Sequence, residues 1–296
     1  MIKSFGKYSG IVCLVVLFVV QASAKGKVVH KSSAITSAKD DSLVFLFKSI
    51  DRQKTDADRR KINDVFAKSL TSYSNKDLFN ASFDTLRKTI SIIDAPDNSF
   101  RIINWMVYYN KGVYDFYGYV LYKQKDTIIS FKLTDNSAKM PKPEEVTTTN
   151  ADWYGALYYD IIKSGTEEDP YYVLLGWDGN DLFTNRKVIE ALSFDENYIP
   201  NFGKPVFQFK EDDLRQRVVF EFSESATMKL RYEPKYNMII FDHLSPAKST
   251  LEGKSEYYGS DFTFDALKFE DYKWTLMEDI NIRNPKTKQS KKIKNK

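Results

Sequence analysis

Residues 170–192 read Pro-Tyr-Tyr-Val-Leu-Leu-Gly-Trp-Asp-Gly-Asn-Asp-Leu-Phe-Thr-Asn-Arg-Lys-Val-Ile-Glu-Ala-Leu. The apolar run at 171–177 is typical of a strand. The polar cluster Asp-Gly-Asn-Asp at 178–181 predicts a tight turn, because glycine accepts a positive φ without steric cost. Beyond the turn, apolar residues recur at i, i+1 and i+4, which predicts a short helix over residues 184–192.

Segments with an apolar-polar alternation lie on both sides of this stretch and predict further strands. No segment repeats another at a fixed period, which disfavours a propeller or a solenoid. We expect strands over residues 89–93, 100–110, 113–122, 128–133, 153–163, 171–177, 205–209, 217–223, 227–233, 237–242, 262–264 and 269–277. The predicted fold class is α+β, predominantly an antiparallel β meander with an N-terminal helical arm and one short internal helix.

The N-terminal helical arm is expected over residues 41–80. The Thr-Asp-Ala-Asp stretch at 55–58 resembles a capping box, and the apolar spacing after it is typical of an amphipathic helix that packs on a core. Residues 25–40 are small, polar and basic, and we interpret them as a linker. A single globular domain would then cover residues 41–284, with a β-rich body at 86–280.

The first 24 residues have the features of a secretory signal peptide. Two lysines precede an apolar core at 11–20, and Ala-Ser-Ala at 22–24 is a small-residue cleavage site. This core is shorter than the roughly 20 apolar residues that span a bilayer, although an uncleaved anchor is the alternative interpretation. We therefore expect an exported mature chain that begins at Lys25, has no transmembrane span, and is periplasmic, associated with the outer membrane or secreted.

The opposite end, residues 285–296, holds six lysines and one large apolar residue, which predicts a disordered Lys-rich tail. The whole chain has a net charge of +4, but without this tail and the two lysines of the signal peptide the body carries −4. The basic character therefore belongs to the two ends, and we expect no nucleic-acid partner. The tail either touches anionic surfaces weakly or only keeps the chain soluble.

The residue types that most catalytic and metal sites use are scarce. Cys13 lies in the expected signal peptide and His30 in the expected linker, so the body keeps one histidine, His243. Disulfides, thiol nucleophiles and multi-histidine metal sites are thereby excluded, and the phosphate-loop, dinucleotide and serine-hydrolase motifs are absent. We predict no metal and no cofactor, and we assign no catalytic residue.

Paired carboxylates are the remaining route to catalysis, because two acids about 5 or about 6.5–9.5 Å apart can cleave a glycosidic bond. Candidates at turns and strand ends are Asp178, Asp181, Glu221, Glu224, Asp242 and Glu278. Acidic residues are also common on solvated faces, which is the simpler interpretation of each. The 178–181 turn could offer oxygens to Ca²⁺, but it lacks the spacing of a dedicated loop, so a hydrogen-bonded turn is the favoured interpretation.

Aromatic residues make up 15% of the chain, and many tyrosines occur in adjacent pairs. In a strand, one member of such a pair must face outward, where it can stack on a sugar or anchor a partner protein. Cross-strand aromatic packing is the structural alternative. The residues that we predict to bind a ligand are Trp177, Asp178, Asn180, Asp181, Tyr171 and Trp153.

Several segments of the body carry a resemblance to known proteins. The stretches at 171–180, 184–190, 205–209, 217–220 and 238–244 resemble uncharacterised exported proteins of Bacteroidota-type bacteria. The resemblance covers roughly residues 80–280 and implies a location in the cell envelope. No activity is assigned to that family, so the resemblance implies none for this chain.

These observations favour an exported, envelope-associated and non-enzymatic module that binds an envelope protein or a glycan through exposed aromatics. One alternative is a glycan-directed hydrolase with two carboxylates, which requires a cleft that contains both acids. The other is a structural component of an envelope complex, which would co-purify with its partners in stoichiometric amounts. Whether the protein is an enzyme is left open, with the absence of catalytic motifs favouring a binding role.

Overall fold

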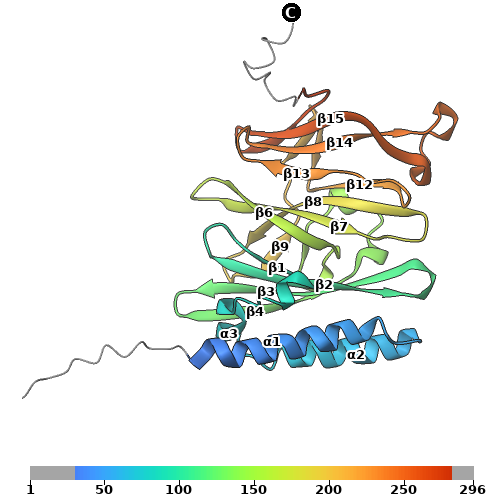
Figure 1. The fold of residues 1–296 in the computed structure, drawn as a ribbon. Helices are drawn as coiled ribbons and strands as arrows, with labels where there is room; N and C mark the ends of the chain where they lie inside the picture. Colours follow the sequence, from blue (N-terminus) through green and yellow to red (C-terminus); the bar gives the residue numbers. More distant parts are fainter. Residues whose placement is uncertain (1–30, 282–296) are drawn as a thin grey trace, which may run out of the picture.

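The computed structural model describes residues 31–281, and these form four stacked layers, with helices on one side and three β-sheets above them (Figure 1). The chain passes through the layers roughly in sequence order, from the helices to the outermost sheet. The fold is thus α+β and rich in antiparallel strands, as the sequence predicts. The expected signal peptide and the expected Lys-rich tail lie outside the described residues. Within residues 31–281, no helix combines the length and the apolar character that crossing a membrane requires.

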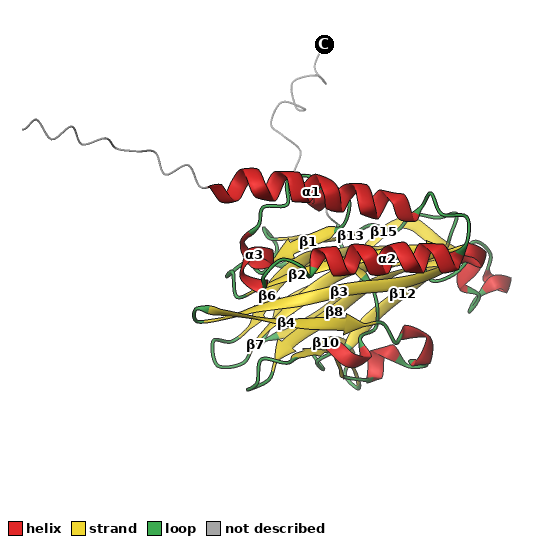
Figure 2. Cartoon of the chain, turned by 90° about the horizontal axis from the view of Figure 1, so that it is seen from below, coloured by secondary structure: helices red, strands yellow, loops and turns green. Residues whose placement is uncertain are grey.

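The helical layer consists of α1 (Lys31–Ile50), α2 (Asp56–Leu70) and α3 (Asn75–Asn80). Figure 2 shows α1 and α2 lying side by side across the first sheet. As the capping pattern predicts, the Thr55 side chain accepts a hydrogen bond from the Asp58 N–H at 3.1 Å. The side chain of Asp56 accepts a hydrogen bond from the Asn110 N–H at 2.9 Å. This bond ties the start of α2 to the connection between β2 and β3 of the first sheet.

The interpretation of residues 25–40 as a linker is wrong from Lys31 onward, because α1 begins there. The segment is polar but contains no glycine or proline after Lys31, so nothing interrupts a helix that its apolar C-terminal half stabilises by packing. Asp40 attaches the middle of α1 to the segment at residues 85–86. Its buried carboxylate accepts hydrogen bonds from the backbone N–H groups of Thr85 and Leu86 at 2.9 and 3.1 Å.

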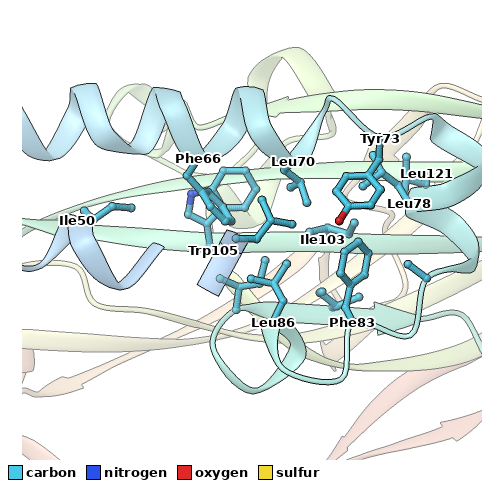
Figure 3. Packing of buried hydrophobic residues seen from close by; sticks show 14 of the residues in the cluster. Ile50, Phe66, Leu70, Tyr73, Leu78, Phe83, Leu86, Ile103, Trp105 and Leu121 are labelled. Atoms are coloured by element: carbon cyan, nitrogen blue, oxygen red, sulfur yellow. The ribbon is translucent and has the colours of Figure 1, made fainter. Parts of the chain in front are cut away.

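The first sheet is a four-stranded antiparallel meander. Its strands are β1 (Ser91–Asp94), β2 (Phe100–Tyr109), β3 (Val113–Gln124) and β4 (Thr127–Thr134). Large residues cover both faces of β2. Ile103 and Trp105 point into the core beneath the helices, which Figure 3 shows, whereas Phe100 and Ile102 point to the next sheet.

The middle sheet has the order β5-β9-β8-β7-β6, and β12 pairs with the N-terminal half of β8. Its strands are β5 (Thr148–Thr149), β6 (Leu157–Gly165), β7 (Pro170–Asp178), β8 (Thr184–Phe194), β9 (Pro200–Phe202) and β12 (Arg217–Ser223). The short internal helix predicted over 184–192 is therefore wrong, because this segment is β8. Val188 packs toward the first sheet and Ile189 toward the third. A strand that is buried on both faces carries adjacent apolar residues, and these imitate helical spacing.

The third sheet has the order β11-β10-β16-β15-β14-β13. Its strands are β10 (Phe207–Lys210), β11 (Asp213–Arg215), β13 (Leu230–Glu233), β14 (Met238–Pro246), β15 (Tyr258–Glu270) and β16 (Lys273–Met277). Neighbouring strands run antiparallel except β10 and β16, which run parallel. Short 3₁₀ helices lie in the connections, at Leu86–Lys88, Asn110–Gly112, Ser137–Lys139, Pro143–Glu145, Asn150–Asp152, Ser249–Leu251 and Ser255–Tyr257.

Candidate functional site

The turn at residues 178–184 joins β7 to β8 and is closed by its own acidic side chains. The Asp178 carboxylate accepts a hydrogen bond from the Asn180 N–H at 2.8 Å. The Asp181 carboxylate accepts from the N–H groups of Phe183 and Thr184 at 2.8 and 2.9 Å. Within residues 31–281, no group of three or more histidine, cysteine or acidic residues is placed to hold a metal ion. The hydrogen bonds of Asp178 and Asp181 to backbone N–H groups account for both acids of the turn.

The six residues predicted to bind a ligand do not form one surface. Trp153 and Tyr171 are buried, so neither can offer a ring for stacking. The Trp153 indole N–H donates to the Tyr158 hydroxyl at 2.7 Å, and the Tyr171 hydroxyl donates to the Tyr272 carbonyl at 3.1 Å. Both are core aromatics, because the middle sheet is covered on both faces. The other four lie in or beside the turn, where Asp178 is buried, Trp177 and Asn180 are half-buried and Asp181 is exposed.

A row of charged residues crosses three strands of the middle sheet. The strand register places Asp178 of β7 opposite Arg186 of β8, and Arg186 opposite Glu221 of β12. Arg186 Nε donates to Glu221 Oε2 at 2.8 Å, and Arg186 Nη1 lies 3.6 Å from Asp178 Oδ2. Two of the acids that the sequence offers as a catalytic pair are thus brought together, with a guanidinium group between them. Thr184 extends the row, because its hydroxyl donates to Glu221 Oε1 at 3.3 Å.

Tyr154 packs against this row from below. Its hydroxyl donates to Asp178 Oδ2 at 3.2 Å. Burial raises the pKa of the Asp178 carboxyl, while the Asn180 N–H and Arg186 oppose that rise. Burial also raises the pKa of Tyr154, and the nearby Asp178 charge adds to the rise, so this phenol stays protonated and acts as a donor. The row therefore presents a neutral donor and a cation beside its carboxylates.

A second charged pair lies deeper on the same face, four residues along each strand. Glu190 of β8 stands opposite Arg217 of β12, and both side chains are fully buried. Tyr158 donates to Glu190, and Arg217 donates to Glu190 and to the Pro143 carbonyl. These partners compensate the desolvation of both charges, which a buried ion pair requires.

A cavity of about 680 Å³ opens above Arg186 and Glu221 of this row. Arg186, Glu221 and Tyr154 form its floor, residues 137–145 form one wall, and residues 212–215 form the other. Arg215 lies in the second wall, where it forms a bidentate pair with Asp213 at 2.7 and 2.9 Å and reaches Glu144 of the first wall at 3.2 Å. The cavity is thus polar and is bridged by an ion pair at its rim. We call it the charged cavity.

A separate apolar surface gathers at the tips of two hairpins, β2–β3 and β7–β8. We call it the hairpin-tip patch, and it consists of Tyr108, Val113, Tyr114, Trp177, Leu182 and Phe183. The Tyr114 ring lies 5.0 Å from that of Tyr108 and 5.5 Å from that of Trp177. The tips of the two hairpins are in close contact. Leu182 packs so tightly against Gly112 that a Cβ added to Gly112 would lie 2.5 Å from Leu182 Cγ.

Sequence reasoning found Trp177, Asp178 and Glu221 but missed their partners. Arg186 and Glu190 interrupt an apolar stretch whose spacing predicts a helix, and a charge inside a buried strand pattern is a signal of such a network. The pair Leu182-Phe183 also carried a signal of an exposed apolar surface, because apolar residues within a polar turn have no neighbouring segment to bury them. Of the remaining acids, Asp242 accepts a backbone hydrogen bond from Lys229 at 2.9 Å, and Glu224 and Glu278 lie exposed outside the charged cavity.

Comparison of the chain with protein-family models, with curated proteins and with solved structures finds no match.

Proposed function

We propose that the protein is an exported, non-enzymatic interaction module that binds a partner protein of the cell envelope through the hairpin-tip patch. The observation that carries this proposal is the exposure of large apolar side chains at one place. Phe183 is 68% exposed and Leu182 is 54% exposed, and Val113 beside them is 47% exposed. Contiguous apolar surface of this kind typically marks an interaction site in a soluble domain.

The composition of the patch favours a protein over a glycan. Leu182, Phe183 and Val113 have no polar group, and such side chains gain free energy by entering an apolar pocket of a partner. A sugar stacks on a flat and open aromatic face, but the Tyr114 and Trp177 rings meet edge to face at 86° and cover each other in part. Charged residues beside the patch, such as Lys111 and Glu224, whose N–H donates to the Phe183 carbonyl at 2.8 Å, would form the polar rim of the interface.

The proposed binding surface is tested with the double variant Leu182→Ser/Phe183→Ser, because both side chains belong to a turn and are more than half exposed. Phe262→Ser is the matched control, since Phe262 is 89% exposed and lies in β15 of the third sheet, outside the patch. Immobilised wild type and control are expected to retain the same envelope protein in stoichiometric amount. The double variant should bind it at least about 30-fold more weakly, as loss of a hot-spot residue does.

Three outcomes would contradict the proposal. The double variant could retain the protein as well as wild type does, or no extract protein could bind in stoichiometric amount. Alternatively, binding could survive protease treatment of the extract and disappear after periodate oxidation, which destroys glycans. That last result would assign the patch to a glycan instead.

The exported state is a separate element of the proposal and rests on residues 1–24. Intact-mass measurement of the protein from the periplasm of an expressing bacterium should give a chain that begins at Lys25. A chain that keeps Met1 and stays in the cytoplasm would remove the envelope from the proposed function.

A further inference from the structure

The charged cavity is a preformed structure, because several hydrogen bonds fix its wall to β12. The Gln216 N–H donates to the Glu144 carbonyl and the Gln216 amide to the Glu145 carbonyl, both at 2.9 Å. The Glu144 carboxylate accepts from the Val219 N–H at 3.0 Å. Arg217 holds the same wall from beneath through its bond to Pro143. A ligand that enters would not have to order this wall, which lowers the free-energy cost of binding.

Four charged side chains reach this cavity from fixed positions. Arg186 and Glu221 on the floor keep 27% and 31% of their side-chain surface exposed. Arg215 and Glu144 at the rim keep 29% and 31% exposed. Each guanidinium presents N–H donors and each carboxylate presents acceptor oxygens, so donors and acceptors alternate around the opening.

The charge balance of the lining limits the class of ligand. Five carboxylates (Glu144, Glu145, Asp212, Asp213 and Glu221) face three cations (Lys142, Arg186 and Arg215). An anion would meet this excess of negative charge, and a cation would have to lie against two guanidinium groups. An apolar ligand would remove water from the charged floor without replacing its hydrogen bonds.

A hydroxyl group satisfies both kinds of partner, since it donates to a carboxylate and accepts from a guanidinium. Neighbouring hydroxyls on one ring could therefore bridge Arg186 and Glu221. Met140, Pro141 and Leu214 in the walls offer apolar surface to the C–H faces of the same ring. The volume of about 680 Å³ lies in the range of small-molecule sites. We propose that the charged cavity binds an uncharged, polyhydroxylated small molecule of monosaccharide to disaccharide size.

This inference is independent of the proposed function, because no residue of the hairpin-tip patch lines the charged cavity. The variant Leu182→Ser/Phe183→Ser, which should no longer bind the partner protein, should bind the sugar as tightly as wild type does. Loss of sugar binding in a cavity variant should likewise leave the partner protein bound.

The experiment is calorimetric titration of the mature chain with a panel of neutral probes: the common hexoses, pentoses, N-acetylhexosamines and their disaccharides. Glucuronate and glucosamine serve as the anionic and cationic counterparts. We expect at least one neutral probe to bind with a Kd below about 10 mM. The two charged counterparts should not bind more tightly than that probe does.

Glu221→Gln keeps the shape of the floor but removes the charged acceptor, and it should weaken binding at least about tenfold. Glu196→Gln is the matched control, because Glu196 is exposed and lies outside the cavity. Leu214→Trp provides a second variant that fills the opening from an exposed position and leaves the ion pairs intact. Thermal unfolding would verify that each variant is folded.

The proposal is overturned by any of three results. These are no binding by any neutral probe up to about 10 mM, binding of glucosamine or glucuronate alone, and unchanged affinity in both Glu221→Gln and Leu214→Trp.

Discussion

At the scale of single residues, the buried Glu190–Arg217 pair places two charges where water does not reach. Neither side chain has exposed surface, and Tyr158 and the Pro143 carbonyl are their other partners. Such a pair contributes little net stability over an apolar pair, but it penalises any state in which only one partner is present. It therefore acts to fix the register of β12 on β8.

Removing one partner of this pair should be far more costly than removing both. We expect Arg217→Met to lower the free energy of unfolding by about 3–5 kcal/mol, because it leaves the Glu190 carboxylate buried without a cation. The double variant Arg217→Met/Glu190→Gln should recover much of that loss. Urea unfolding of the single variants and the double variant measures this coupling. Lys142→Met breaks an exposed pair and should change the stability by less than about 1 kcal/mol.

The stability losses of the two single variants could instead add up in the double variant. That result would show that the two charges are not coupled.

His243 gives stability a dependence on pH. Its Nδ1 lies 2.7 Å from Asp265 Oδ2, and this hydrogen bond raises the pKa of His243, with burial acting against it and Asp261 and Glu278 adding to the rise. Because the pKa is raised in the folded state, the stabilisation is fully present below the unfolded value of about 6.5. It is lost as the pH rises through the folded pKa.

The variant His243→Gln should therefore be less stable than wild type at about pH 5.5, by at most about 1 kcal/mol because the imidazole is partly exposed. The difference should shrink as the pH is raised to about 8.5, because His243 loses its charge as the pH passes through its folded pKa. Urea unfolding at both values provides the test, and NMR titration of His243 gives its pKa directly. A difference that grows with pH would have the wrong sign for this mechanism.

At the scale of elements, a buried hydrogen bond between two side chains helps to join the helical layer to the first sheet. The indole N–H of Trp105 in β2 donates to Asn63 Oδ1 of α2 at 2.8 Å, and both residues are buried. Asn63→Leu would leave that N–H without an acceptor in the core, at a cost of about 1–3 kcal/mol. Asp64→Ala changes the exposed neighbour on the same helix and should be nearly neutral. Thermal or urea unfolding of both variants compares them, and equal stabilities would show that this bond does not hold the layers together.

Elements with a clear local pattern could be predicted from the sequence. The capped helix α2, the four-stranded meander and the span of β12 all follow from spacing and turn residues that lie within the segment itself. The segment 184–192 could not be assigned correctly, because its true pattern depends on two covering sheets that lie far away in the sequence. The same limit applied to α1, whose middle is held by contacts of Asp40 to residues 85–86.

The candidate site was predictable only in its separate pieces. Asp178 and Glu221 stood out as acids beside turns, but the registers of β7 and β12 on β8 decide that both reach Arg186. The local spacing of residues does not determine which strands pair when they are far apart in the sequence. Tyr171 was misplaced for a related reason, since the outward side of a strand is buried wherever a second sheet covers it. Trp153 was misplaced because it lies before β6, in a connection that packs into the core between the first two sheets.

At the scale of the whole molecule, the stacking of three sheets predicts a gradient of local stability. The strands β7 and β8 have neighbours on both edges and sheets on both faces, whereas β4 and β13 lie at sheet edges. Amides of β7 and β8 should exchange with deuterium slowest, and those of β4 and β13 markedly faster. Hydrogen exchange followed by mass spectrometry of peptides would measure this order. Equal protection across all layers would contradict it.

The parallel pairing of β10 with β16 also affects how the protein is made. Phe207 of β10 stands opposite Trp274, so the β10–β11 hairpin joins its sheet through a strand that the ribosome adds much later. That hairpin carries Arg215 and with it one wall of the charged cavity. A nascent chain without β16 would lack the neighbour that holds this wall in place. The complete cavity is therefore expected only once β16 has been made, close to the end of synthesis.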